Sequence, residues 1–289
     1  MKSLAYPVVV GLCAVLALAA DQNRTPTFQD KARNMALYAV KDFSIRNVPP
    51  DLLEFRMSGD SAKGLPVEGD WKSQGLQIVA MSLTGSAKRV SANSYSLLKA
   101  DAGGGVKASL QPPSSGWSTV FRSESVNVTV DKAAKLIAPG AVDVTAESSG
   151  TADLKGQAVP VTADLALHGS SLTATMEADE QGISGKSSSV LAGPVKLSLK
   201  RTFHGAGNPI QSIVATGDRL TTTFDQNGGT ITLSGHVVID GDSDAFSGEA
   251  HADSVSVKVD GALNPIEVDL SGSPARSTYS DHPARRGGG

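Results

Sequence analysis

Asp240, Asp242 and Asp244 place three carboxylates at alternate positions, a spacing at which oxygen ligands for calcium occur in proteins. A calcium loop of the EF-hand type also needs glycine at its sixth position and a bidentate glutamate at its twelfth. Ala245 and His251 occupy those two positions. The pattern therefore favours a solvated hairpin tip over a calcium site.

A second group, Glu249, His251 and Asp253, also consists of residue types that bind metal ions. The spacing of two residues places all three on one face of a strand. Successive positions on such a face lie about 7 Å apart, which is too far for a compact site without ligands from another strand. We therefore expect a polar outer face here and no metal.

The sequence elements that usually support hydrolysis are missing. The chain has five histidines and many serines, but it contains no Gly-x-Ser-x-Gly element for a nucleophile. Two tryptophans and four tyrosines are few for the aromatic platforms of sugar-binding sites. A secreted hydrolase would still require two carboxylates about 5 to 10 Å apart across a cleft. We expect no enzymatic activity, no catalytic residue and no cofactor.

The composition argues against nucleic acid as a partner. Lys and Arg total 26 against 29 Asp and Glu, so the formal net charge of −3 offers no basic field to a phosphate backbone. Hydrophobic residues make up 40% of the 289 residues, but aromatic residues only 4%. A large core is therefore possible, built mainly from small and β-branched side chains.

The N-terminus has the features of an export signal. Lys2 precedes an apolar run from Val8 to Ala20, which ends in small residues before Asp21. This pattern predicts a signal peptide over residues 1–20, and an uncleaved N-terminal anchor is the alternative. We therefore expect an exported protein.

Strand-like alternation of apolar and polar residues follows a polar linker at residues 21–30. It is clearest between Pro209 and Gly272, where odd positions from Ile231 to Ile239 are mostly apolar. Turn residues separate such segments, so neighbouring strands are expected to pair as an antiparallel meander. The residues after 274, 275–289, are too polar to bury a core and are predicted to be disordered.

Glycine and proline within this pattern predict where strands end. A first strand is expected to end before Pro49. Further breaks or turns are expected at 103–105, Pro139-Gly140, 148–150, Gly169, Gly193-Pro194 and Asp240-Gly241. The many strands that result are typical of a sandwich, a barrel or a folded-over sheet.

Residues from Ile210 to Gly272 resemble a known family. The likeness rests on a Leu-Ser-Gly-x-Val element at Leu233–Val237 and on the segments around it, which are 213–217, 220–224 and 250–255. This succession is similar to the OstA-like module of periplasmic lipopolysaccharide-transport proteins, the LptA/LptC family. In that family a hairpin with a small residue and an acid follows the strand that carries this element.

The resemblance implies an all-β fold, an elongated open β-jellyroll in which one sheet of many short antiparallel strands folds over like a taco. The jellyroll would cover residues 31–274, as one unit or as two stacked modules with the clearest at 209–272. The resemblance also implies a periplasmic protein, free or tethered to the inner membrane. Its partners would be other envelope transport components, or further copies of the chain joined by edge-strand addition.

The function implied by the resemblance is to hold the acyl chains of lipopolysaccharide or a related glycolipid and to pass them toward the outer membrane. The alternating apolar side chains expected to line the interior are Leu220, Phe224, Ile231, Leu233, Val237, Ile239, Val255, Val257 and Val259. Packing in an ordinary core selects the same pattern. The competing hypothesis is therefore a structural or adhesive surface protein whose strands form a closed, dry sandwich.

Overall fold

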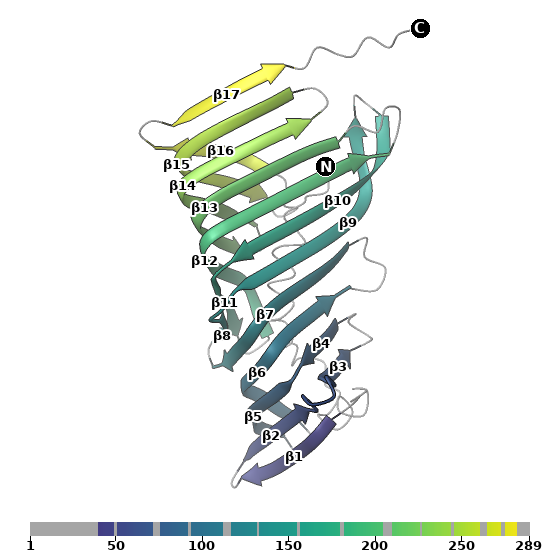
Figure 1. The fold of residues 1–289 in the computed structure, drawn as a ribbon. Coiled ribbons are helices and arrows are strands. Elements are labelled where there is room, and N and C mark those ends of the chain that lie inside the picture. The colour runs from purple at the N-terminus through teal and green to yellow at the C-terminus, as the bar shows by residue number, and fades with distance from the viewer. Residues whose placement is uncertain are drawn as a thin grey trace.

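The computed structural model describes residues 40–48, 51–71, 76–91, 94–111, 117–131, 133–154, 157–179, 182–204, 210–225, 227–243, 246–260, 265–272 and 275–281. The predicted signal peptide and linker lie outside these residues. The described residues form 17 strands and no helix, which confirms the all-β class (Figure 1). Within the described ranges, therefore, no helix is long and apolar enough to cross a membrane.

All of the strands belong to one antiparallel sheet. Their bounds are β1 Val40–Val48, β2 Leu52–Gly59, β3 Val67–Trp71, β4 Leu76–Ala80, β5 Ser82–Ser91, β6 Ser94–Leu110, β7 Trp117–Val130, β8 Ala133–Ala138, β9 Val142–Leu154, β10 Gln157–Gly169, β11 Ser171–Asp179, β12 Gly182–Phe203, β13 Ile210–Asp225, β14 Gly228–Ser243, β15 Phe246–Asp260, β16 Pro265–Ser271 and β17 Arg276–Asp281. The predicted strand before Pro49 is β1, and it is confirmed.

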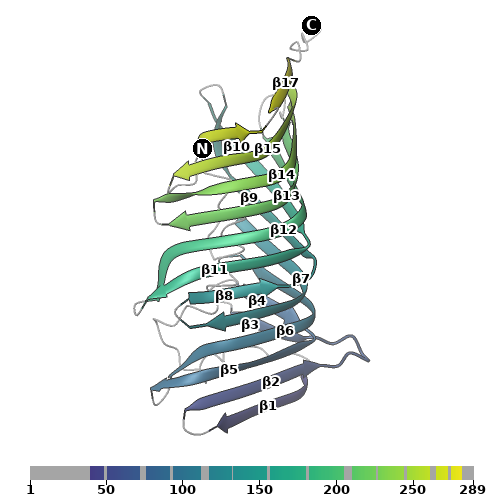
Figure 2. The same cartoon turned by 90° about the vertical axis from the view of Figure 1, so that its left-hand side faces the viewer.

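The sheet folds over into two walls, which face each other along the length of the molecule (Figures 1 and 2). The first wall consists of β1, β2, β5, β8, β11 and β16 with one half of each long strand. The second wall consists of β3, β4, β9, β10 and β17 with the other halves. Six long strands, β6, β7, β12, β13, β14 and β15, contribute to both walls.

A line of register shifts, which we call the crease, separates the two walls. The shifts fall between Gly103 and Val106 in β6, between Ala192 and Val195 in β12, and between Ser234 and Val237 in β14. Gly104, Gly105, Gly235 and His236 adopt positive φ there, which is uncommon for the non-glycine residue. Strands that stop at the crease are joined by short connections instead, such as the single residue Ser170 between β10 and β11.

Several expected breaks are therefore wrong. Residues 103–105 lie within β6, residues 148–150 within β9, Gly193-Pro194 within β12 and Asp240-Gly241 within β14. Glycine inside a strand permits a bulge or a bend while the ladder continues on both sides. Many strands are consequently longer than the short strands that the sequence predicts, and β12 has 22 residues.

The predicted disorder after residue 274 is also wrong in part. Arg276–Asp281 forms β17, which pairs with residues 246–251 of β15 in the second wall. The strand contains few apolar residues, so the sequence shows no strand-like alternation there. Backbone hydrogen bonds to β15 hold β17 in the sheet. Residues 282–289 of the predicted tail lie outside the described residues.

The core lies between the walls. Its largest fully buried side chains come from both of them, with Leu136 and Leu172 on the first wall and Phe121, Val142 and Val144 on the second. These residues belong to a single cluster that extends from β4 to β15. A smaller cluster of Leu53, Phe55, Met57 and Val67 lies toward the end formed by β1. The inner faces thus pack together as in a sandwich through the middle of the molecule.

Candidate functional site in the interior between the walls

Apolar side chains run in cross-strand rows along the inner face of the first wall. One row, parallel to the crease, passes from strand to strand through Ala138, Leu172, Leu191, Leu220, Leu233, Val255 and Leu270. Residues directly opposite each other in an antiparallel pair lie on the same face, so each row is one continuous strip. A second strip, two residues farther from the crease, ends in Ile231, Val257 and Val268.

All nine residues predicted to line the interior lie on the inner faces. Leu220, Phe224, Ile231, Leu233, Val255, Val257 and Val259 belong to the first wall, and Val237 and Ile239 to the second. Six are buried, whereas Ile231, Ile239 and Val257 are only partly buried. Contact of these residues with lipid stays a prediction.

The exposure of inward-facing residues changes along the molecule. Phe121 and Val142 in the middle are 2% and 0% exposed. Near the end formed by β16 and β17, Leu270 and Val268 are 41% and 55% exposed, although they continue the same two strips. Ile213, which shares the inner face with buried Ala215, is 41% exposed. The middle is therefore a dry core, and the end near β16 presents an apolar inner face to solvent.

An arginine interrupts the apolar inner face of the second wall. On β12 the inward positions after the crease are Val195, Leu197, Leu199, Arg201 and Phe203, and Phe203 is buried. The Nε atom of Arg201 is buried and has no hydrogen-bond partner. Burial lowers the pKa of its guanidinium from the usual value, because desolvation disfavours the charged form.

A pair of hydroxyl groups interrupts the apolar strips of the first wall. Ser189 on β12 and Thr222 on β13 are buried, and their side-chain oxygens lie 2.7 Å apart in a hydrogen bond. Each hydroxyl satisfies the other, so the pair avoids the cost of an unpaired buried polar group. It supplies no reactive group, because neither hydroxyl contacts a base in the described structure.

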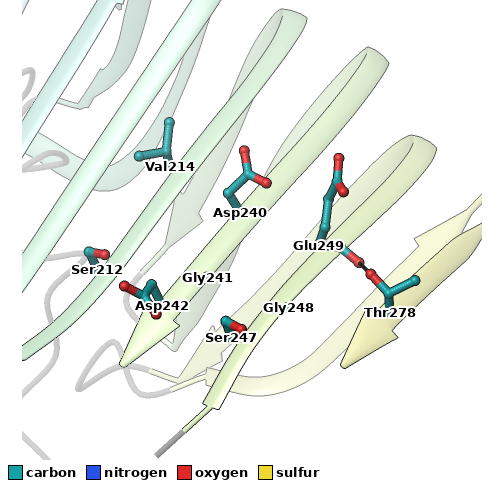
Figure 3. A pocket seen from close by; sticks show the side chains of 9 residues that line it. All are labelled: Ser212, Val214, Asp240, Gly241, Asp242, Ser247, Gly248, Glu249 and Thr278. Atoms are coloured by element: carbon teal, nitrogen blue, oxygen red, sulfur yellow. Dashed lines mark hydrogen bonds between the residues drawn. The ribbon is translucent and has the colours of Figure 1, made fainter. Parts of the chain in front are cut away.

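A depression on the outer face of the second wall is lined by three acidic residues of β14 and β15 (Figure 3). Its lining residues are Ser212, Val214, Asp240, Gly241, Asp242, Ser247, Gly248, Glu249 and Thr278. Asp240 and Glu249 are directly opposite each other, where like charges repel. Among the described residues, no three His, Cys, Asp or Glu side chains could together hold a metal.

Histidine–carboxylate pairs lie on the outside of the fold. His251 Nε2 contacts Glu249 Oε1 at 2.7 Å, so two of the three residues Glu249, His251 and Asp253 are in contact through their side chains. At the crease, His236 Nδ1 lies 2.8 Å from Asp218 Oδ2. The hydrogen bond to Asp218, and then its negative charge, raise the pKa of His236, which is fully exposed. The protonated pair therefore forms at acidic pH and is lost as pH rises through that pKa.

The fold and its interior define an all-β protein in which one folded sheet carries an apolar inner face, buried in the middle and exposed near β16. No family model, no curated protein and no solved structure matches the chain.

Sequence reasoning missed Arg201 as a residue of the interior. The residue stands in Leu197-Ser198-Leu199-Lys200-Arg201, where Leu197 and Leu199 mark the inner positions and the next position of that parity is the arginine. A strand pattern that continues past its last leucine was the available signal. Arginine is mostly found at the protein surface, so its charge predicts an outward position for residue 201.

Proposed function

We propose that this chain is a non-enzymatic envelope protein that holds the acyl chains of lipopolysaccharide or a related lipid and passes them toward the outer membrane. The observation that carries the proposal is the exposed apolar inner face near β16. Val268 and Leu270 point inward there, whereas Glu267 on the same strand forms an ion pair with Lys258 on the outer face. An inner face of this kind resembles a lipid-facing surface more than a finished core.

The energy available from such a surface is sufficient for lipid binding. Each methylene group transferred from water to an apolar surface contributes about 0.8 kcal/mol, so ten methylenes supply about 8 kcal/mol before the cost of association. Partly buried Ile231, Ile239 and Val257 extend the surface from the exposed end toward the dry middle.

We expect photo-crosslinking to separate the inner face from the outer face. A benzophenone amino acid in place of Ile213 or Val257 should crosslink to radiolabelled lipopolysaccharide in the cell envelope, because both positions face inward. The same amino acid at the adjacent positions Val214 and Ser256, which face outward, should not. Organic extraction of the purified protein, followed by mass spectrometry, identifies the lipid that co-purifies.

The dry middle favours a second candidate, a structural or adhesive surface protein. Val142, Ala134 and Ala138 are each 0% exposed, as in a closed sandwich. In that case the crosslinks at Ile213 and Val257 would not exceed those at Val214 and Ser256, and extraction would release no lipid. That pair of results would reject lipid binding.

Partners would bind by adding a strand to an edge of the sheet. They would be either other envelope transport components or further copies of the chain. Among the described strands, β1 pairs only with β2, and β16 only with β15, so the first wall has a strand edge at each end. Such an edge can receive another strand through its backbone groups.

Mixing two cysteine variants tests end-to-end addition. Copies carrying Asn47→Cys in β1 and copies carrying Asp269→Cys in β16 should form mixed disulfides on mild oxidation, because stacking brings these edges together. Cysteine at exposed Lys107, inside the sheet, is the matched control. A yield of mixed dimers equal to that of the control, measured on non-reducing gels, would contradict the proposal.

A further inference from the structure

Arg201 occupies an inward position on β12 with an apolar residue at the inward position on either side of it along the strand. On β12 it lies between Leu199 and Phe203, two residues away in each direction. Across the ladders it pairs with buried Ala163 of β10 and with Gln211 of β13. The guanidinium is therefore anchored on the inner face, at the end of β12 remote from the crease.

The guanidinium lacks a counter-charge within the described structure. Its Nε is buried without a hydrogen-bond partner, and none of the ion pairs found among the described residues includes Arg201. Arginine remains protonated at physiological pH and presents its five N–H donors in a planar fork. A buried donor left unpaired destabilises the folded chain, so a hydrogen-bond acceptor supplied by a ligand would stabilise it.

The residues around Arg201 include both polar and apolar side chains, as a site for an amphiphilic ligand requires. Gln211, beside Arg201, pairs in turn with Ser243 of β14, so the row through Arg201 is polar on the side of β13 and β14 and apolar at Ala163 of β10. The next row toward the crease contains Leu199 and Ile213, and Ile213 is 41% exposed. A ligand at this place would meet a cation and hydrogen-bonding groups at one end and an apolar surface at the other.

We propose that Arg201 binds the phosphate group of an acylated lipid whose chains lie on the apolar inner face beside Leu199 and Ile213. A phosphate accepts two parallel hydrogen bonds from the guanidinium fork, and the charge on both partners strengthens them. The inference rests on the proposed lipid-binding function and adds to it the head-group chemistry and the residue that selects it. A neutral lipid would leave the Nε of Arg201 unpaired and would bind more weakly.

Two lipids with the same chain and different head groups test the inference on the purified full-length protein. Lauroyl lysophosphatidic acid and lauroyl glycerol, both below their micelle concentrations, compete with an apolar fluorescent dye. We expect the phosphate lipid to bind about tenfold or more tightly than the neutral one. Arg201→Gln should abolish this preference by weakening the binding of the phosphate lipid, and Arg201→Lys should retain part of it.

Lys200→Gln is the matched control, because Lys200 is the adjacent cation on the same strand and is exposed on the outer face. Circular dichroism verifies that each variant is folded. Equal affinities for the two lipids, or an equal loss of preference in Lys200→Gln, would overturn the role of Arg201 and leave lipid binding standing. Failure of both lipids and the dye to bind would overturn the proposed function as well. Competition by inorganic phosphate as effective as that by the phosphate lipid would replace the lipid site with a simple anion site.

Discussion

Gly193→Ala is expected to lower the free energy of unfolding by about 2 to 3 kcal/mol, because the added methyl group has no space at the crease. A Cβ at position 193 would overlap the backbone carbonyl oxygen of Asp218 on β13 and lie 3.0 Å from its Cα. The obstacle is backbone, so a side-chain rotation cannot relieve it. Either β12 or β13 must shift at the place where both cross from one wall to the other.

Gly140→Ala is the control, since Gly140 lies in the connection at the same crease. A Cβ there would approach no atom closer than the Glu124 Cβ at 4.0 Å. Urea unfolding of the two variants, followed by circular dichroism, measures the difference in midpoint. Equal midpoints would mean that the two strands do not approach each other closely at the crease.

Phe121→Ala is expected to cost about 3 to 5 kcal/mol of unfolding free energy, whereas Val268→Ala should cost less than about 0.5 kcal/mol. Both residues face the interior, but Phe121 is 2% exposed and Val268 is 55% exposed. Removing the Phe121 ring leaves a cavity between the walls, where neighbours such as Val144 cannot collapse fully. Removing methyl groups from Val268 exposes little that water does not already reach.

The comparison of Phe121→Ala with Val268→Ala also bears on function. Val268→Ala should weaken lipid binding while leaving stability nearly unchanged, if the exposed end is the lipid-binding surface. A loss of stability at Val268 comparable to that at Phe121, again measured by urea unfolding, would show that the end near β16 is a closed core in solution.

The alternation of apolar residues was sufficient to predict the all-β class and the inward direction of nine side chains. In β14 the alternation continues unchanged across the crease, since Leu233 and Val237 are an even number of positions apart and both point inward. In β13 the parity changes, because buried Ala215 and buried Leu220 differ by an odd number. Each half of β13 alternates regularly by itself, so the sequence pattern indicates the inward residues of both halves.

The crease itself could not be predicted from local sequence. Gly193-Pro194 and residues 103–105 have the composition of turns, and a turn and a bend both require residues that tolerate unusual backbone angles. What distinguishes them is whether the ladder continues on the far side, which depends on strands distant in sequence. The same limit applies to β17, because its residue types do not indicate a strand and its pairing depends on β15. Arg201 could be placed inside only once β12 was known to extend to Phe203.

The order of strands within each wall follows the order of the chain, from β1 at one end to β16 and β17 at the other. Every strand consequently makes its ladder hydrogen bonds with strands close to it in sequence. Stability in such a quasi-one-dimensional array is approximately a sum of nearest-neighbour interfaces. Loss of a terminal strand then removes one interface and leaves the remainder paired, so the molecule can open and close at its ends without global unfolding.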